Sequence, residues 1–143
     1  MEFRRGDKIE VCSKEEGFVG SYYEATVVSQ LRKDLYVVQY KNLLEDNNDS
    51  EPLVETVRAG EVRPVPPQIP ASEFGLFDAV DAFDNDGWWV GAISGKKGSD
   101  DYFVFFETTG DEIAYPVSRL RVHLDWVKAK WVSPKQRWLL IYS

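Results

Sequence analysis

The residue types that could carry catalysis are scarce in this sequence. His123 is the single histidine and Cys12 the single cysteine. No serine stands in a nucleophile-elbow pattern, and no cluster of His, Asp and Glu has metal-ligand spacing. The segment Gly95–Gly98 resembles a phosphate loop only superficially, because no helix is predicted after it. The sequence therefore predicts a protein that is not an enzyme and needs no cofactor, with His123 as a surface or packing residue.

Aromatic side chains are abundant and offer a different chemistry. They make up 14% of the residues, and two aromatic pairs, Tyr22-Tyr23 and Trp88-Trp89, stand at corresponding places of predicted strands. A methylated ammonium group has lost hydrogen-bond donors and spreads its charge. It is therefore bound by aromatic faces at cation–π distance, usually with a carboxylate nearby. The sequence favours a binding function of this kind, in which aromatic side chains converge at one end of a small barrel.

The charge balance restricts the partners. The chain carries 24 acidic against 17 basic residues, a formal net charge of −7. A protein that binds nucleic acid through its phosphates needs a positive surface, so nucleic acid is not expected as the main ligand. An acidic surface suits a basic partner such as a histone tail, although it also serves solubility alone.

The compartment follows from what the sequence lacks. A single cysteine excludes internal disulfides and cysteine-based zinc sites and favours the cytosol or the nucleus. No segment reaches the ~20 consecutive apolar residues of a membrane helix. The N-terminal residues also lack the apolar core of a signal peptide. No membrane association is expected.

The chain contains two copies of one pattern. Two of the matched blocks share an offset of 66 positions, and the mismatches fall between blocks, where turns are expected. The blocks are Tyr22–Val27 with Trp88–Ile93, Tyr36–Tyr40 with Tyr102–Phe106, Ile9–Val11 with Val80–Ala82, and Val62-Arg63 with Leu120-Arg121.

Each copy has the period of short β-strands. Residues in Lys8–Val11 and Tyr23–Val27 alternate in twos, and Phe103–Phe106 is a short run of aromatic and β-branched side chains. A sheet of four or five strands exposes its edges unless it curls shut, which predicts a small barrel. A core of ~60–70 residues is marginal by itself, so mutual packing is expected. The predicted fold is all-β, with two tandem five-stranded barrels packed together.

A proline-rich joint separates the copies. Four prolines between positions 64 and 70 restrict the backbone and block strand pairing. We predict a first barrel over residues 1–66, a linker over 67–74, a second barrel over 75–132 and a C-terminal tail over 133–143.

Specific motifs resemble a known family. The stretch Glu16–Val27 is similar to the plant Agenet signature, as are Arg63-Pro64 closing the first copy and Leu120-Arg121, Trp126 and Trp131 closing the second. The resemblance covers roughly residues 3–132. Agenet domains belong with Tudor and chromo domains to the Royal superfamily. This implies small Tudor-like barrels that often bind methyl-lysine or methyl-arginine. Among plant Agenet proteins, the pair is most similar to a tandem unit that reads histone H3 methylated at lysine nine.

The resemblance implies a methyl-lysine cage in the second copy. The end of the first strand supplies Phe83, the start of the second supplies Trp89, and the end of the third supplies Phe106. Asp111 follows as the polar partner. This copy matches the family pattern at every wall.

The resemblance also implies a second candidate cage, in the first copy. Its walls are Tyr23 and Tyr40, with Glu45 as the acidic partner. Cys12 stands where the family has an aromatic residue, and Phe18 of the longer loop is a candidate substitute. Which of the two barrels holds the methyl-lysine stays open at this point, as do the mark and the degree of methylation.

Residues around the cages are expected to contact the rest of a basic peptide. Several acidic side chains near one site would speed encounter and fix the register of a histone tail. The predicted peptide contacts are Asp46, Asp49 and Glu51 of an acidic loop, Asp84 and Asp86 of the second copy, and the aromatic pair Tyr22 and Trp88.

Two functions remain open. The first is a chromatin reader that binds a methylated lysine of histone H3 in plant heterochromatin, acts in gene silencing and is nuclear. The alternative is a protein-interaction or RNA-binding scaffold of the fragile-X tandem Agenet type, which the net charge of −7 disfavours for RNA. Further Agenet repeats in a longer protein are compatible with either.

Overall fold

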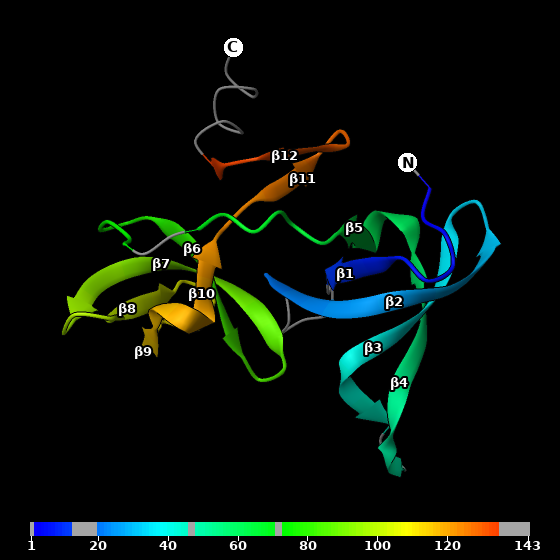
Figure 1. The fold of residues 1–143 in the computed structure, drawn as a ribbon, viewed down its shortest axis with the longest axis horizontal. Coiled ribbons are helices and arrows are strands. Elements are labelled where there is room, and N and C mark those ends of the chain that lie inside the picture. The colour runs from blue at the N-terminus through cyan, green and yellow to red at the C-terminus, as the bar shows by residue number, and fades with distance from the viewer. Residues whose placement is uncertain (1, 13–19, 46–47, 71–72, 135–143) are drawn as a thin grey trace. The chain divides into compact units, whose positions relative to one another are not determined.

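The computed structural model divides the chain into two units of β structure (Figure 1). It describes the chain apart from residues 1, 13–19, 46–47, 71–72 and 135–143, and of residues 45 and 48–50 it describes the backbone. The first unit holds Met1–Val65 with Asn85–Gly87, and the second holds Pro66–Asp84 with Trp88–Ser143.

The first unit is an antiparallel sheet of five strands around one core. β1 pairs with both β2 and β5, β2 pairs with β3, and β3 pairs with β4. In the part of the chain that the structure describes, the ladder stays open between β4 and β5, where a turn of 3-10 helix makes the connection. The elements are β1 (Lys8–Cys12), β2 (Ser21–Arg32), β3 (Leu35–Glu45), β4 (Asn48–Arg58), η1 (Ala59–Glu61) and β5 (Val62–Pro64).

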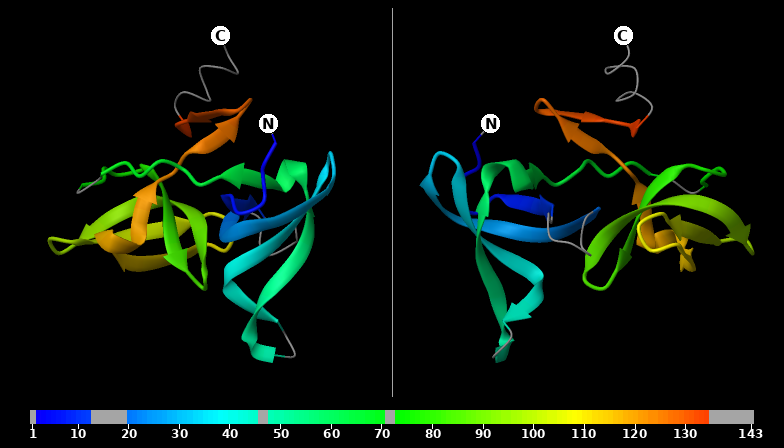
Figure 2. Two further views of the ribbon diagram at one scale, coloured as in Figure 1. Left: turned by 45° about the vertical axis from the view of Figure 1, so that its right-hand side comes forward. Right: turned by 180° about the vertical axis from the view of Figure 1, so that it is seen from behind.

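The second unit repeats this topology. β6 pairs with β7 and β10, β7 with β8, and β8 with β9. A two-stranded hairpin, β11–β12, follows β10 and has no counterpart among the described residues of the first unit (Figure 2). The elements are β6 (Ala79–Asp84), β7 (Gly87–Lys97), β8 (Asp101–Phe106), β9 (Asp111–Pro116), η2 (Val117–Arg119), β10 (Leu120–Val122), β11 (Asp125–Val127) and β12 (Lys130–Val132).

The two sheets share one strand register. Val27 on β2 lies opposite Val38 on β3, and the residues 66 positions later, Ile93 and Val104, lie opposite each other on β7 and β8. Each ladder then shifts by one residue at the same place, after Val27 and after Ile93. All four side chains are buried. The duplication predicted from the sequence is therefore confirmed at the level of individual residue pairs.

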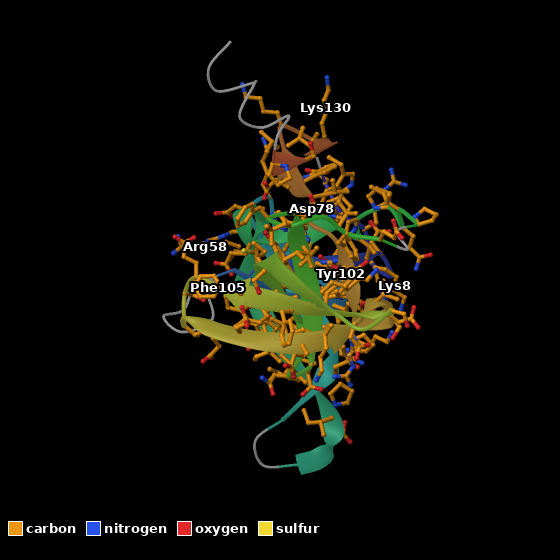
Figure 3. The ribbon with its side chains drawn as sticks, turned by 90° about the vertical axis from the view of Figure 1, so that its left-hand side faces the viewer. Lys8, Arg58, Asp78, Tyr102, Phe105 and Lys130 are labelled. Atoms are coloured by element: carbon orange, nitrogen blue, oxygen red, sulfur yellow. The ribbon has the colours of Figure 1, made fainter. Side chains whose placement is uncertain are left out.

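One end of each core is closed by an aromatic pair. The Phe3 N–H donates to the hydroxyl of Tyr36 at 3.1 Å, and their rings meet edge to face at 5.8 Å. In the second unit the Phe74 N–H donates to the hydroxyl of Tyr102 at 3.2 Å, with ring centroids 5.5 Å apart. Tyr102 is labelled on β8 in Figure 3. Phe74, the last residue of the predicted linker, thus packs within the second unit.

An aspartate turn follows each of these phenylalanines. The Asp7 carboxylate accepts a hydrogen bond from the Arg4 N–H at 2.8 Å, and the Asp78 carboxylate accepts one from the Gly75 N–H at 2.7 Å. The carbonyl of each aspartate also accepts from the next strand, at Val27 and Ile93. A phenylalanine four residues before an aspartate is therefore a sequence signal of this barrel, and the sequence analysis missed it.

The structure confirms the predicted fold class, two tandem five-stranded Tudor-like barrels. The packing of the barrels against each other, predicted from their size, stays a prediction. Residues 135–143 of the predicted tail lie outside the described residues. Within the described residues no helix is long and apolar enough to cross a membrane.

Candidate functional site

Three aromatic rings and one carboxylate meet in the second barrel. Trp89 lies two and four positions before Gly91 and Ile93 on β7, so strand alternation turns its side chain toward the same core as theirs. It packs against the buried cluster that contains Phe106 and Tyr115. The rings of Phe106 and Tyr115 meet edge to face with centroids 6.1 Å apart.

Asp84 accepts hydrogen bonds from two of these aromatic side chains. Its carbonyl oxygen accepts a hydrogen bond from the Trp89 indole N–H at 2.7 Å, and its carboxylate accepts one from the Tyr115 hydroxyl at 2.7 Å. Burial, followed by the hydrogen bond to Asp84 and the charge of that residue, raises the pKa of Tyr115. Tyr115 therefore remains a donor, and the carboxylate of Asp84 lies beside the rings. We call Asp84, Trp89, Phe106 and Tyr115 the second-barrel cluster.

A glycine lets the sheet close tightly behind the second-barrel cluster. A Cβ at Gly91 would lie 2.5 Å from Cγ1 of Val104, 2.9 Å from the carbonyl oxygen of Phe105 and 3.2 Å from the ring of Phe106. No side chain fits at such distances without displacing backbone. The first barrel has Ala25 at the matched position, so the close approach of β7 to β8 is particular to the second barrel.

The first barrel has a smaller aromatic group at the equivalent place. Tyr23 and Tyr40 meet edge to face at 6.4 Å, and both are buried. The Tyr40 hydroxyl lies 3.5 Å from a carboxylate oxygen of Glu55. Burial raises the pKa of Tyr23. This group offers two rings and an acid, against three rings and an acid in the second barrel.

One of the predicted walls lies elsewhere. The Phe83 ring packs on Trp88 with centroids 5.1 Å apart, and it alternates with the buried Ala82, so it points to the outer face of its sheet. Cys12 lies opposite Tyr22 on the outer face of the first barrel. The structure therefore brings Trp89 and Phe106 together but places Phe83 with Trp88.

The predicted acidic contacts are spread over several places. Asp84 belongs to the second-barrel cluster rather than to a separate peptide surface, and the exposed Asp111 lies opposite Phe106 on β9. Asp86 is exposed in the β6–β7 turn, and Glu51 is exposed on β4. Phe18 and Asp46 lie outside the described residues, and only the backbone of Glu45 and Asp49 is described.

Sequence reasoning missed Tyr115 and Glu55. Tyr115 lies opposite the buried Tyr102, and Glu55 lies opposite the buried Val38, so both side chains share a face with core residues. Once the third strand of each copy is recognised, the alternation of the fourth strand places both residues on the inner face of the sheet, where Tyr115 is buried and Glu55 is exposed. The fourth strands were not assigned residue by residue, because their hydrophobic pattern is weak.

A buried ion pair joins the first and last strands of the first barrel. Glu10 and Arg63 lie opposite each other on β1 and β5, with Arg63 Nη2 2.7 Å from Glu10 Oε1, and both side chains are buried. The Arg63 guanidinium also stacks 3.5 Å above the centroid of the Tyr22 ring. One face of Tyr22 is thereby covered.

The second barrel repeats this arrangement with an added histidine. Arg121 Nε lies 2.8 Å from Asp81 Oδ2 and its guanidinium is 4.1 Å above the Trp88 ring. His123 Nδ1 lies 2.7 Å from the other Asp81 oxygen, and Nε2 lies 3.1 Å from Asp125. Burial by itself lowers the pKa of His123, but hydrogen bonds to Asp125 and Asp81 and their charges raise it to about 9. His123 is a cationic packing residue.

Comparison with known proteins gives one family. The Agenet domain family model matches residues 6–67. The Arabidopsis thaliana protein AGENET DOMAIN (AGD)-CONTAINING P1 is 37% identical over 132 residues, covering 92% of this chain and 25% of that protein. DUF724 domain-containing protein 3 of the same plant is 35% identical over 94% of this chain and 20% of its own length. The chain thus spans a quarter or less of these relatives.

Two crystal structures match both barrels. That of Arabidopsis thaliana AGDP1 AGD34 superposes with a TM-score of 0.88 at 35% identity and covers 92% of this chain and 90% of its own. That of ADCP1 tandem Agenet domain 3-4 gives a TM-score of 0.83 at 31% identity, over 92% and 88% of the two chains. The matched domains are protein-binding modules rather than enzymes.

Proposed function

We propose that this chain, which belongs to the Agenet family as a tandem pair of its barrels, binds a methylated lysine of a histone H3 tail. The observation that carries the proposal is the second-barrel cluster. It combines three aromatic rings with a carboxylate, which is the chemistry that a methylated ammonium requires. We assign the methyl-lysine to the second barrel.

The residues of the cluster have separate tasks. The half-buried Trp89 offers the largest π face, and its orientation is fixed by the 2.7 Å hydrogen bond to the Asp84 carbonyl. Phe106 and Tyr115 form the deeper wall, at 7% and 4% exposure. Asp84 supplies negative charge, and the exposed Asp111 opposite Phe106 adds a second carboxylate. A cation held among these groups would be attracted by ring quadrupoles and by charge.

The first barrel is less suited to this task. Its two rings, Tyr23 and Tyr40, are both buried and pack edge to face on each other. No third ring stands at the place of Tyr115, because the matched residue opposite Tyr36 is Val57. We assign to this barrel a supporting part in holding the tail, together with the exposed acid Glu51 on β4.

The rest of the tail is proposed to be bound through charge. A net charge of −7 favours a basic peptide, and exposed acids beside the site would act on its lysines and arginines. Our first candidate for the mark is methylation of lysine nine, which places the protein in the nucleus at heterochromatin. What the longer relatives do as whole proteins goes beyond the part that this chain spans.

An array of histone peptides tests the proposal. The 143-residue chain is applied to peptides that carry each methylation state at each lysine, and the strongest hit is titrated by calorimetry beside its unmethylated form. We expect an H3 peptide methylated at lysine nine to bind at least tenfold more tightly than the unmethylated peptide. Equal binding of both forms would overturn the proposal. Salt-dependent binding to RNA without methyl selectivity would favour the scaffold function instead.

A further inference from the structure

The second barrel carries an apolar patch on the outer side of its sheet. On β7, β8 and β9, the side chains that point away from the core include Ala92, Gly95, Phe103, Phe105 and Ala114. They form two adjacent rows across the strands, with Ala92 opposite Phe105, and with Gly95 and Ala114 on either side of Phe103. We call these five residues the outer face of β7–β9.

The matched positions of the first barrel are mostly polar. There the two rows consist of Thr26 and Val54 on either side of Gln39, and of Ser29 and Thr56 on either side of Val37. Both barrels have the same register and the same register shift. The fold therefore does not require apolar residues at these positions, and the outer face of β7–β9 needs another explanation.

Contacts within the barrel explain only part of this face. The Phe103 ring covers Gly95, since a Cβ there would lie 3.6 Å from Cδ2 of Phe103, and Lys97 Nζ lies 6.0 Å from the ring centroid. Phe105 is different, because 41% of it is exposed (labelled in Figure 3). A large aromatic side chain in the next row, flanked by Ala92, is available to a partner.

We propose that a second copy of this chain docks on the outer face of β7–β9. A two-fold interface requires a self-complementary patch, and the charges at its ends satisfy this condition. Lys97 lies at one end of β8, opposite Asp101, and Glu112 lies beside Phe105 toward the other end. A two-fold axis that passes midway between these two charges, at Phe103, brings Lys97 of each copy to Glu112 of its partner and covers Phe105 in the adjacent row.

Association through the edge of the sheet is a poorer alternative. In the part of the chain that the structure describes, β9 pairs only with β8 and so forms an edge. Asp111 and Glu112 stand on this strand and Pro116 ends it, and charges and proline are the devices that prevent strands from pairing edge to edge. The open surface is therefore the face of the sheet.

Sedimentation velocity of the 143-residue chain tests the proposal. The measurement covers the widest concentration range that solubility allows, at moderate salt that screens the repulsion between two copies of net charge −7. We expect reversible dimers. Phe105→Gln introduces the residue that the first barrel carries at this position, Gln39, and should weaken the dimer roughly tenfold or more without unfolding the barrel. Leu31→Gln, which removes a more exposed apolar side chain from the first barrel, should leave the dimer unchanged.

A charge exchange distinguishes this interface from unspecific association. Lys97→Glu and Glu112→Lys should each weaken the dimer severalfold, because each places like charges opposite one another. The double variant Lys97→Glu/Glu112→Lys should restore dimerisation. A chain that is monomeric over the whole range, a dimer unaffected by Phe105→Gln, or a double variant as weak as the single ones would overturn the proposal.

Discussion

Where the first barrel has Tyr23, the second has Trp89, and where the first has Val57 opposite its core tyrosine, the second has Tyr115. Ala25 on β2 is matched by Gly91 on β7. These exchanges lie on a shared frame, since the register, the register shift, the closing Phe–Tyr pair and the buried acid–arginine pair occur in both. The frame is what the fold needs, and we propose that the exchanged positions are where the two barrels differ in function.

The largest expected effect is on the buried ion pairs. Removal of one partner leaves an uncompensated buried charge, which costs about 3–5 kcal/mol of unfolding free energy. Asp81→Ala is expected to cost the second barrel this amount, because it removes the buried carboxylate that Arg121 and His123 share. Glu10→Ala is expected to cost the first barrel a similar amount through Arg63.

The distribution of tryptophan makes this comparison measurable. All 5 tryptophans stand at residue 88 or later, so tryptophan fluorescence reports urea unfolding of the second unit and far-UV circular dichroism reports both. Asp81→Ala should move the fluorescence transition, while Glu10→Ala should act on the circular dichroism transition. Equal displacement of the fluorescence transition by both variants would contradict the assignment of one network to each unit.

The second barrel should also depend on pH in a way that the first does not. The pKa of His123 rises from 6.5 to about 9 in the folded chain, so protonated His123 stabilises the fold. This contribution is fully present below pH 6.5 and is lost as pH rises to about 9. At about 1.4 kcal/mol per pKa unit it amounts to at most about 3–4 kcal/mol.

The single histidine gives one imidazole signal in proton NMR, and its titration midpoint should lie near 9. His123→Gln should remove the pH dependence of the fluorescence transition between pH 6.5 and 9. A midpoint near 6.5, or a wild-type stability that does not change over this range, would show that the two aspartates do not hold the imidazolium.

A smaller effect is expected where the strands approach closely. Gly91→Ala should destabilise the second barrel by about 1–3 kcal/mol, because its Cβ meets Val104 and the Phe105 carbonyl. The reverse change, Ala25→Gly, should cost the first barrel about 0.5–1 kcal/mol through backbone entropy and lost contacts. Urea unfolding measures both. A Gly91→Ala variant with unchanged stability to urea would mean that β7 and β8 lie farther apart than described.

The smallest effect concerns the acidic residues at the start of β4 and just before it; the sequence predicts a loop here, but Asp49 and Glu51 lie on β4. Exposed charge pairs are individually worth about 0–1 kcal/mol, so neutralising Asp46, Asp49 and Glu51 together should weaken binding of a basic peptide only severalfold. The peptide affinity should also fall as salt rises. Calorimetry at low and high salt measures both. Salt-independent binding, or a triple variant with unchanged affinity, would assign specificity to the barrels alone.

Much of the fold could be predicted because the chain repeats itself. The matched blocks carry core residues such as Val38 and Val104 at a constant spacing, and a period of two fixes their face. Because the two copies have the same spacing, a strand assigned in one copy can be checked against the other. The tandem all-β architecture therefore follows from the residues alone. The Phe–Asp turns also repeat, and they would have placed Phe74 in the second barrel.

The site was harder to predict, because it depends on which face a strand end presents. Phe83 and Asp84 are neighbours at the end of β6, and one residue of register decides which of them joins the second-barrel cluster. Tyr115 lies on β9, whose exposed Asp111, Glu112 and Ile113 hide the alternation. Arg63 stacks on Tyr22 and Arg121 stacks on Trp88. In each pair the arginine comes from a strand far from the aromatic residue in sequence, and spacing alone does not indicate the contact.

We propose that the second barrel holds the methylated lysine. The most direct test compares the peptide affinities of Trp89→Leu and Tyr23→Leu. Leucine keeps apolar bulk but has no π face. We measure the affinity of both variants for the best methylated H3 peptide by calorimetry, after circular dichroism has shown that each is folded. Trp89→Leu should lower the affinity about tenfold or more, whereas Tyr23→Leu should change it by less than about twofold. A loss confined to Tyr23→Leu, with Trp89→Leu binding as the wild type does, would contradict the account.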